Sequence, residues 1–176
     1  MGTGSPRPRQ SRVIVGALFG TGAPEVSDFV AIFEVGIAAM LVVGMFVVRA
    51  GHVRLHKYIQ SSMVLVNIPV VLSWMVPQYL TYVLPDVGTE LLNPYYLLPT
   101  LGLVVGGLAE ALGIYILLVA GTNWVPEGWR FRRYKVWMRT ELGLWWAVVV
   151  IGLAIYYVWY VLPVPSSPYA PPPPPY

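Results

Sequence analysis

Four long stretches of the chain are apolar and almost free of charge. Residues 29–48 hold one charged residue, residues 58–85 hold none, residues 91–126 hold one and residues 142–176 hold none. A helix that crosses the hydrocarbon core of a bilayer needs about 20 mainly apolar residues. Each stretch reaches that length. The sequence therefore predicts an all-α, integral membrane four-helix bundle with an extended N-terminal arm and a polyproline C-terminal tail.

The composition excludes several other classes of protein. Only 11% of the 176 residues are charged and 57% are hydrophobic, whereas a soluble domain needs charged side chains on its surface. We expect no nucleic-acid partner, because such a protein would need a basic face on a soluble fold. The chain has no cysteine, which excludes disulfides and thiolate metal sites.

Composition also divides the chain into three parts. We predict an N-terminal arm at 1–27 with a short interfacial segment at 13–21, a bundle at 28–162, and a proline-rich tail at 163–176. Within the bundle, the hydropathy pattern and helix-end signals give four expected spans. They are residues 28–49, 51–82, 95–121 and 138–162.

Individual residues within the spans predict local features. Ser27 and Asp28 precede the first apolar run and suit a helix N-cap. Pro69 and Pro77 lie inside the second span, where we expect a bend. The third span carries a small-xxx-small pattern, which favours close contact between helices. Its small residues are Gly102, Gly106, Gly107, Ala109 and Gly113.

The two basic loops predict the orientation. Arg49, Arg54 and Lys57 follow the first span, and five more basic residues lie between the third and fourth spans. The opposite side has three arginines in the arm and an acidic loop with Asp86 and Glu90. Because basic loops face the cytoplasm, we expect a multi-pass protein of the prokaryotic plasma (inner) membrane with both termini extracytoplasmic.

The second basic loop mixes cations with aromatic residues. Its position between two spans makes anionic lipid, or the cytoplasmic face of a partner, the expected target. The residues assigned to lipid are Arg130, Arg132, Arg133 and Lys135.

The C-terminal tail reads SSPYAPPPPPY. Five consecutive prolines impose a polyproline II conformation, which is extended and loses little entropy when it binds. We expect the tail to dock on another subunit through the rings of Tyr169 and Tyr176.

Two strongly polar residues fall near the middle of the membrane, namely Asn67 in the second span and Glu110 in the third. An intramembrane carboxyl group is a functional candidate, as a proton relay or a cofactor partner. The alternative is a neutral Glu110 that is hydrogen-bonded to Asn67 or to a backbone carbonyl and holds helices together. Glu34 lies about 9 Å inside the outer end of the first span, where its expected partner is a polar group or a neighbouring subunit. We expect Glu141, two residues from Arg139, to form a salt bridge with an interfacial arginine.

The two histidines of the chain are His52 and His56, four residues apart on one helix face that continues through Gln60, Met63 and Asn67. Two such histidines can chelate one metal ion, although they cannot hold one haem from both sides. The alternative is a pair of interfacial histidines near lipid headgroups.

The segments LHKYIQSSMVLVNIPVVLSWM and WRFRRYKVWMRTELGLWWAVVVIGLAIYYVWYV give residues 27–162 a resemblance to a known family. The chain resembles the small four-helix membrane proteins of unknown function that include the CtaM-type cytochrome oxidase biogenesis factors. In that family a His-Arg/Lys-Leu-type motif opens the second span, matched here by His56, Lys57 and the flanking Leu55. Members of that family typically carry a further histidine near the start of the third span, which implies haem or copper handling. In this chain that region reads NPYYLLPTLGL and has no histidine.

We therefore expect a non-catalytic accessory or scaffold subunit of a bioenergetic membrane complex, respiratory or photosynthetic and linked to electron transport. Its expected partners are other integral membrane subunits and anionic lipids, with a bound lipid or pigment possible and no haem or metal site supported. One alternative is a haem- or copper-handling oxidase biogenesis factor that uses His52, His56 and Glu110. The other is a small oligomeric transporter built around Glu110.

Overall fold

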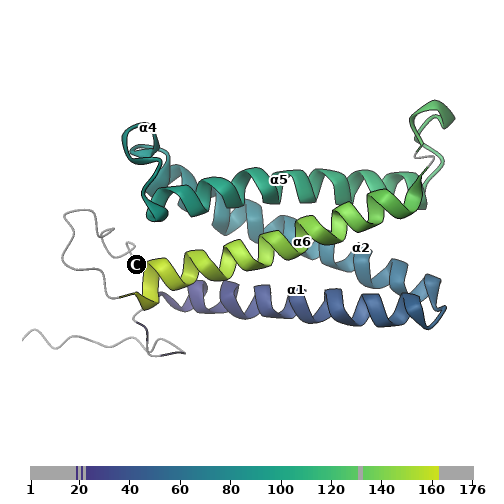
Figure 1. The fold of residues 1–176 in the computed structure, drawn as a ribbon, viewed down its shortest axis with the longest axis horizontal. Helices are drawn as coiled ribbons and strands as arrows, with labels where there is room; N and C mark the ends of the chain where they lie inside the picture. Colours follow the sequence, from purple (N-terminus) through teal and green to yellow (C-terminus); the bar gives the residue numbers. More distant parts are fainter. Residues whose placement is uncertain (1–18, 20, 22, 131–132, 163–176) are drawn as a thin grey trace, which may run out of the picture.

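The computed structural model describes residues 19, 21, 23–130 and 133–162. Four long apolar helices dominate this part of the chain, each long enough to cross a membrane (Figure 1). The protein is thus an all-α, multi-pass membrane bundle, as the hydropathy pattern predicts. The first and third spans are the helices α1 (Glu25–Arg49) and α5 (Pro94–Gly121). The second and fourth spans begin with α2 (Val53–Val70) and α6 (Tyr134–Tyr156) and continue beyond them.

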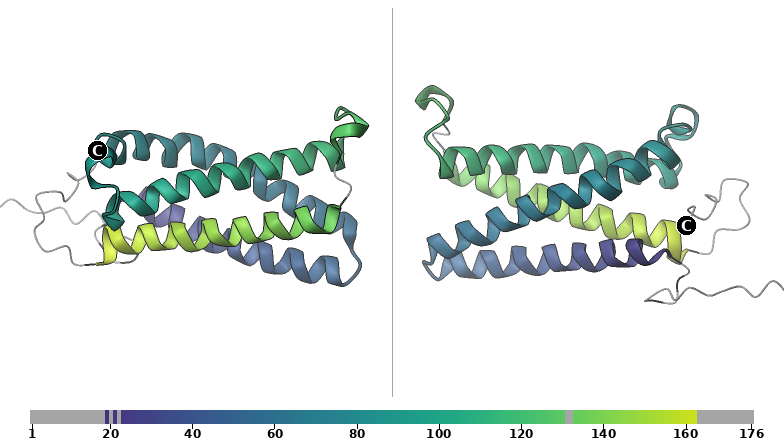
Figure 2. Two further views of the ribbon diagram at one scale, coloured as in Figure 1. Left: turned by 45° about the horizontal axis from the view of Figure 1, so that its top comes forward. Right: turned by 180° about the vertical axis from the view of Figure 1, so that it is seen from behind.

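Loops at the two ends of the bundle carry short helices. The loop before α5 contains α4 (Val87–Glu90), and the loop before α6 contains η3 (Glu127–Trp129). α1 packs against α2 and α6, and α5 packs along α6. The second span and α6 run diagonally, in opposite senses, between α1 on one side and α5 on the other (Figure 1, Figure 2).

The second span changes helix type after each of its prolines. α2 is followed by the π-helical η1 (Val71–Met75), the short α3 (Val76–Gln78) and the π-helical η2 (Tyr79–Val83). A proline has no N–H to donate and its ring crowds the carbonyl of residue i−4, so a wider turn relieves the backbone. A π-helical segment therefore follows each of Pro69 and Pro77, and the bend expected there stays a prediction.

The start of α1 differs from the prediction. The helix begins at Glu25, with Pro24 at the N-cap position, so Ser27 and Asp28 are not caps. Both side chains instead contact the end of the fourth span, which closes with the π-helical η4 (Tyr157–Val161). Ser27 donates a hydrogen bond to the Tyr160 hydroxyl at 3.0 Å, and the Tyr156 hydroxyl donates to Asp28. These bonds tie the two ends of the helical region together.

Glycines let α5 approach its neighbours closely, as the small-residue pattern predicts. A Cβ atom at Gly102 would lie 3.3 Å from Ile151 of α6. At Gly113 it would lie 2.7 Å from the Glu141 carboxyl of α6 and 2.9 Å from Val64 of α2. Side chains of the two neighbours therefore occupy space that only a glycine leaves open.

The packed core lies near the middle of the bundle, where α1, α2 and α6 meet. It is apolar and includes the indole of Trp145, which is 2% exposed. The core fills one part of the interior, while the half nearer the start of α1 is hollow. The buried core residues are Ile37, Leu41, Met63, Val64, Trp145 and Val149.

The predicted arm and tail fall mainly outside this region. Residues 1–18, which include most of the predicted interfacial segment, and the tail 163–176 with Tyr169 and Tyr176 lie outside the described residues. Residues 25–27 of the predicted arm belong to α1.

Candidate functional site: a cavity inside the bundle

All four spans line a cavity of about 490 Å³ in the half of the bundle that contains the start of α1. Along α5 the lining runs from Pro99 to Glu110 and beyond, which corresponds to at least about 16 Å at 1.5 Å per residue. The cavity is therefore elongated along the helices. Its walls are mainly apolar and aromatic, and its aromatic members are Trp74, Tyr79, Trp145, Tyr156, Trp159 and Tyr160.

The crossing of the helices creates this space. The second span and α6 diverge from each other toward this end while α1 and α5 stay on opposite sides (Figure 2). Small residues then line the walls where larger side chains would fill the gap, among them Ala31, Gly102 and Gly106. Because helix crossing sets the volume, the cavity does not follow from the hydropathy pattern alone.

The cavity has an open side along α5. Most of its lining residues are buried or half-buried, whereas Leu103 and Ile114 are 42% and 37% exposed, and Gly107 and Ala111 are also exposed. In a bilayer this side of the bundle faces lipid.

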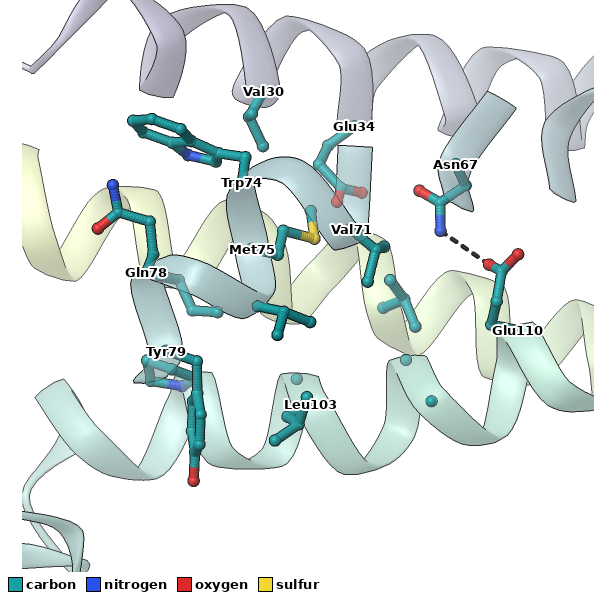
Figure 3. A pocket seen from close by; sticks show the side chains of 18 of the residues that line it. Val30, Glu34, Asn67, Val71, Trp74, Met75, Gln78, Tyr79, Leu103 and Glu110 are labelled. Carbon is teal, nitrogen blue, oxygen red and sulfur yellow. Dashed lines mark hydrogen bonds between the residues drawn. The ribbon is translucent and has the colours of Figure 1, made fainter. Parts of the chain in front are cut away.

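The predicted pairing of Asn67 with Glu110 is confirmed. The Asn67 side-chain amide donates to Glu110 Oε2 at 2.9 Å and links α2 to α5 (Figure 3). The second carboxyl oxygen, Oε1, is buried and has no hydrogen-bond partner among the described residues. Both residues line the cavity, and one carboxyl oxygen of Glu110 has no partner among the described residues.

Glu34 lines the same cavity from α1 (Figure 3). Its side chain is 3% exposed, and no hydrogen bond or ion pair joins it to another described residue. The carboxyl group lies over Gly152 of α6, where a Cβ atom would be only 3.1 Å from it. The sequence signal at Glu34 was its depth in the first span, but its exposure to the cavity depends on the rotation of α1.

The expected ion pair between Arg139 and Glu141 is wrong. Arg139 is exposed, whereas Glu141 is 9% exposed and accepts a hydrogen bond from Trp145 Nε1 at 2.7 Å. Residues that are two positions apart on a helix point to different faces of it. The carboxyl of Glu141 also lies against Gly113, one turn from Glu110.

The structure does not bring His52 and His56 to Glu110. His52 is exposed at the N-cap of α2, and His56 Nδ1 lies 2.9 Å from the Gly44 carbonyl oxygen of α1. His56 is 11 residues before Asn67, so about 16 Å of helix separates it from the Asn67–Glu110 pair. Within the described residues no group of three or more His, Cys, Asp or Glu is placed to hold a metal ion.

The lipid-assigned residues of the second basic loop have different surroundings. Arg130 binds its own loop, through Val125 O at 3.0 Å and Asn123 Oδ1 at 3.4 Å. Arg133 and Lys135 are exposed, and Arg132 lies outside the described residues. Arg130 therefore orders the loop, and the two exposed cations are available to lipid headgroups.

Lys57 has a role that the sequence did not signal. Its ammonium group donates to the Ala120 carbonyl oxygen at 2.7 Å, in the last turn of α5. Cations near a helix C-terminus satisfy free carbonyl groups and offset the helix dipole. This bond joins the start of α2 to the end of α5.

Comparison of the chain with protein-family models, with curated proteins and with solved structures gives no match. The resemblance to the CtaM-type factors stays a prediction.

Proposed function

We propose that this protein is a non-catalytic membrane subunit that holds an apolar molecule, such as a lipid or a pigment, inside its four-helix bundle. The observation that supports the proposal is the elongated cavity of about 490 Å³ with apolar and aromatic walls. A site of this size and lining is typical of sites for small molecules. Its side along α5 would admit a molecule directly from the bilayer.

The setting that we propose is a larger bioenergetic complex in a prokaryotic plasma membrane, with the termini outside and the basic loops in the cytoplasm. A bundle whose cavity is filled by a lipid or pigment would serve such a complex by holding that molecule next to a neighbouring subunit. Lys and Arg in the loops would anchor the bundle on anionic headgroups.

A matched pair of glycine variants tests the cavity. Gly107 lines it, and Gly36 does not; neither has a heavy atom within 4 Å of an added Cβ. Both substitutions, Gly107→Phe and Gly36→Phe, add the same ring to a glycine in open space. We expect the protein purified in a mild detergent to retain a stoichiometric apolar molecule, identified by mass spectrometry of its organic extract. Gly107→Phe should lose that molecule and Gly36→Phe should keep it.

Equal retention by the two variants would contradict the proposed site, and so would an extract that holds only bulk lipid. The assembly is tested separately, by native mass spectrometry of gently solubilised membranes. Detection of other subunits in one complex with the wild-type protein would support the accessory role.

A small oligomeric transporter is the second candidate. It is favoured by Glu34 and Glu110, two carboxyl groups that line a cavity inside the membrane. Transport by a four-helix chain would require copies of this chain to assemble with one another. The same native spectra separate the two candidates, because the transporter would appear as a homo-oligomer without other subunits.

The haem- or copper-handling alternative has no comparable support in the described residues. His52 and His56 lie at the opposite end of α2 from the cavity, and His56 is engaged with the Gly44 carbonyl. A visible absorption spectrum of the purified protein tests this alternative directly.

A further inference from the structure

The charge of the cavity restricts what it can hold. Among the described residues that line it there is no Lys, Arg or His, but there are two carboxyl groups, Glu34 and Glu110. Two more acidic residues are bonded to side chains that line it: Asp28 accepts from Tyr156, and Glu141 accepts from Trp145. The charged side chains among the described lining residues are therefore all acidic, and most of the remaining lining is apolar or aromatic.

The two carboxyl groups that line the cavity are incompletely bonded. Glu34 has no hydrogen-bond partner in the described part of the chain although it is 3% exposed, and Glu110 Oε1 has none either. An unsatisfied carboxyl group in an apolar interior is costly unless a donor or an opposite charge approaches it. An anionic ligand would increase that cost.

The aromatic walls also favour a positively charged ligand. The rings of Trp74, Trp145 and Trp159 line the cavity together with those of tyrosines. The faces of such rings attract cations, most strongly where water is excluded. A cation with an apolar body would therefore satisfy the carboxyl groups and pack against the rings at once.

We propose that the molecule held in the cavity is a lipophilic cation, with its positive charge between Glu34 and Glu110 and its apolar body against the aromatic walls. This inference rests on the proposed binding function and adds the charge of the ligand to it. The same chemistry is found in a membrane lipid with an amine headgroup and in a free hydrophobic cation.

Two ions of the same shape and opposite charge test the proposal. Tetraphenylphosphonium and tetraphenylborate are titrated into the purified full chain in a neutral detergent, and quenching of tryptophan fluorescence reports binding. The signal from Gly107→Phe, whose cavity is blocked, is subtracted as background for each ion. We expect saturable binding of tetraphenylphosphonium and none of tetraphenylborate.

Carboxamide variants locate the charge. Glu34→Gln and Glu110→Gln should each weaken tetraphenylphosphonium binding about tenfold, the scale of one charge contact in a partly desolvated site. Glu127→Gln is the matched control, because Glu127 lies in the exposed η3 turn away from the cavity, and it should bind as the wild type does. Gln at 110 can still accept from Asn67, so the bundle should fold, which circular dichroism would verify.

The outcomes distinguish the two proposals. Equal binding of both ions, unaffected by the carboxamide variants, would overturn the cationic ligand but leave the apolar site intact. Binding of neither ion, with no apolar molecule in the extract, would overturn both. If tetraphenylphosphonium releases an amine-bearing lipid from the protein as prepared, the natural ligand is a lipid headgroup; if it releases a small cation, the ligand is free in the membrane.

Discussion

At the scale of single residues, the link between Asn67 and Glu110 makes the clearest prediction. The two side chains join α2 to α5 by a hydrogen bond of 2.9 Å. Glu110→Gln keeps an acceptor for the Asn67 amide, whereas Glu110→Leu removes it and leaves that amide buried without a partner. We expect Leu to lower the free energy of unfolding by about 1 kcal/mol, the scale of such bonds in membranes, and Gln to change it little.

The measurement is unfolding of the purified variants in mixed micelles, followed by circular dichroism. The matched control is the pair Glu127→Gln and Glu127→Leu, on a side chain exposed in the loop. If Gln at 110 destabilises as much as Leu, the carboxyl group has a role beyond this bond.

A second prediction at this scale concerns Trp159. Pro99 has no N–H for the Tyr95 carbonyl four residues earlier in α5, and the Trp159 indole donates to that oxygen at 3.2 Å. The same indole stacks on the Tyr95 ring, with centroids 5.0 Å apart. Trp159→Phe keeps a ring but loses the donor, so we expect about 1 kcal/mol of destabilisation in the same unfolding assay. Trp124→Phe, on an indole that is 83% exposed, should be neutral.

At the scale of helices, close packing of α5 depends on one glycine more than on the others. A Cβ at Gly113 would meet Glu141 at 2.7 Å and Val64 at 2.9 Å, and both belong to neighbouring spans. Gly113→Ala should therefore force helices or side chains apart and destabilise the bundle by about 1–3 kcal/mol. Gly107→Ala, on the same helix, meets no heavy atom within 4 Å and should be neutral or slightly stabilising. Equal effects of the two alanines on the unfolding midpoint would mean that α5 is not tightly packed at Gly113.

The spans themselves could be predicted because each is a continuous apolar run. The starts of α1 and α6 differ most from the prediction: α1 begins at Glu25 rather than at residue 28, and α6 begins at Tyr134 rather than at residue 138. Polar and aromatic interfacial residues continue a helix beyond its apolar run, and hydropathy does not register them. For the same reason Glu141 lies nearly two turns inside α6, rather than beside Arg139 at the interface.

The candidate site was only partly visible in the sequence. The pairing of Asn67 with Glu110 follows from their depth, because polar groups in a bilayer must find partners. The position of Glu34 beside the same cavity depends on how α1 is rotated and on Gly152 leaving room for its carboxyl group. Rotation and crossing of helices are tertiary properties that a four-span hydropathy pattern does not contain.

For the whole molecule, the orientation in the membrane is the property that the loops predict. The chain has no cysteine, so single cysteines can be introduced without background. Gly88 in α4 and Gly128 in η3 are both exposed, and neither has a heavy atom within 4 Å of an added Cβ. They lie in loops at opposite ends of the bundle (Figure 1).

The basic residues near α2 and α6 should hold their end of the bundle in the cytoplasm. A membrane-impermeant maleimide added to intact cells should then label Gly88→Cys and spare Gly128→Cys. Opening the membrane should make Gly128→Cys reactive. That result would show that its thiol is accessible and that the intact membrane had kept the reagent away from it. Labelling of Gly128→Cys alone in intact cells would invert the orientation and would also put the chain termini in the cytoplasm, since four spans return both ends to one side. In that case the cavity half of the bundle, which contains the start of α1, would face the cytoplasmic leaflet, and its ligand would be sought there.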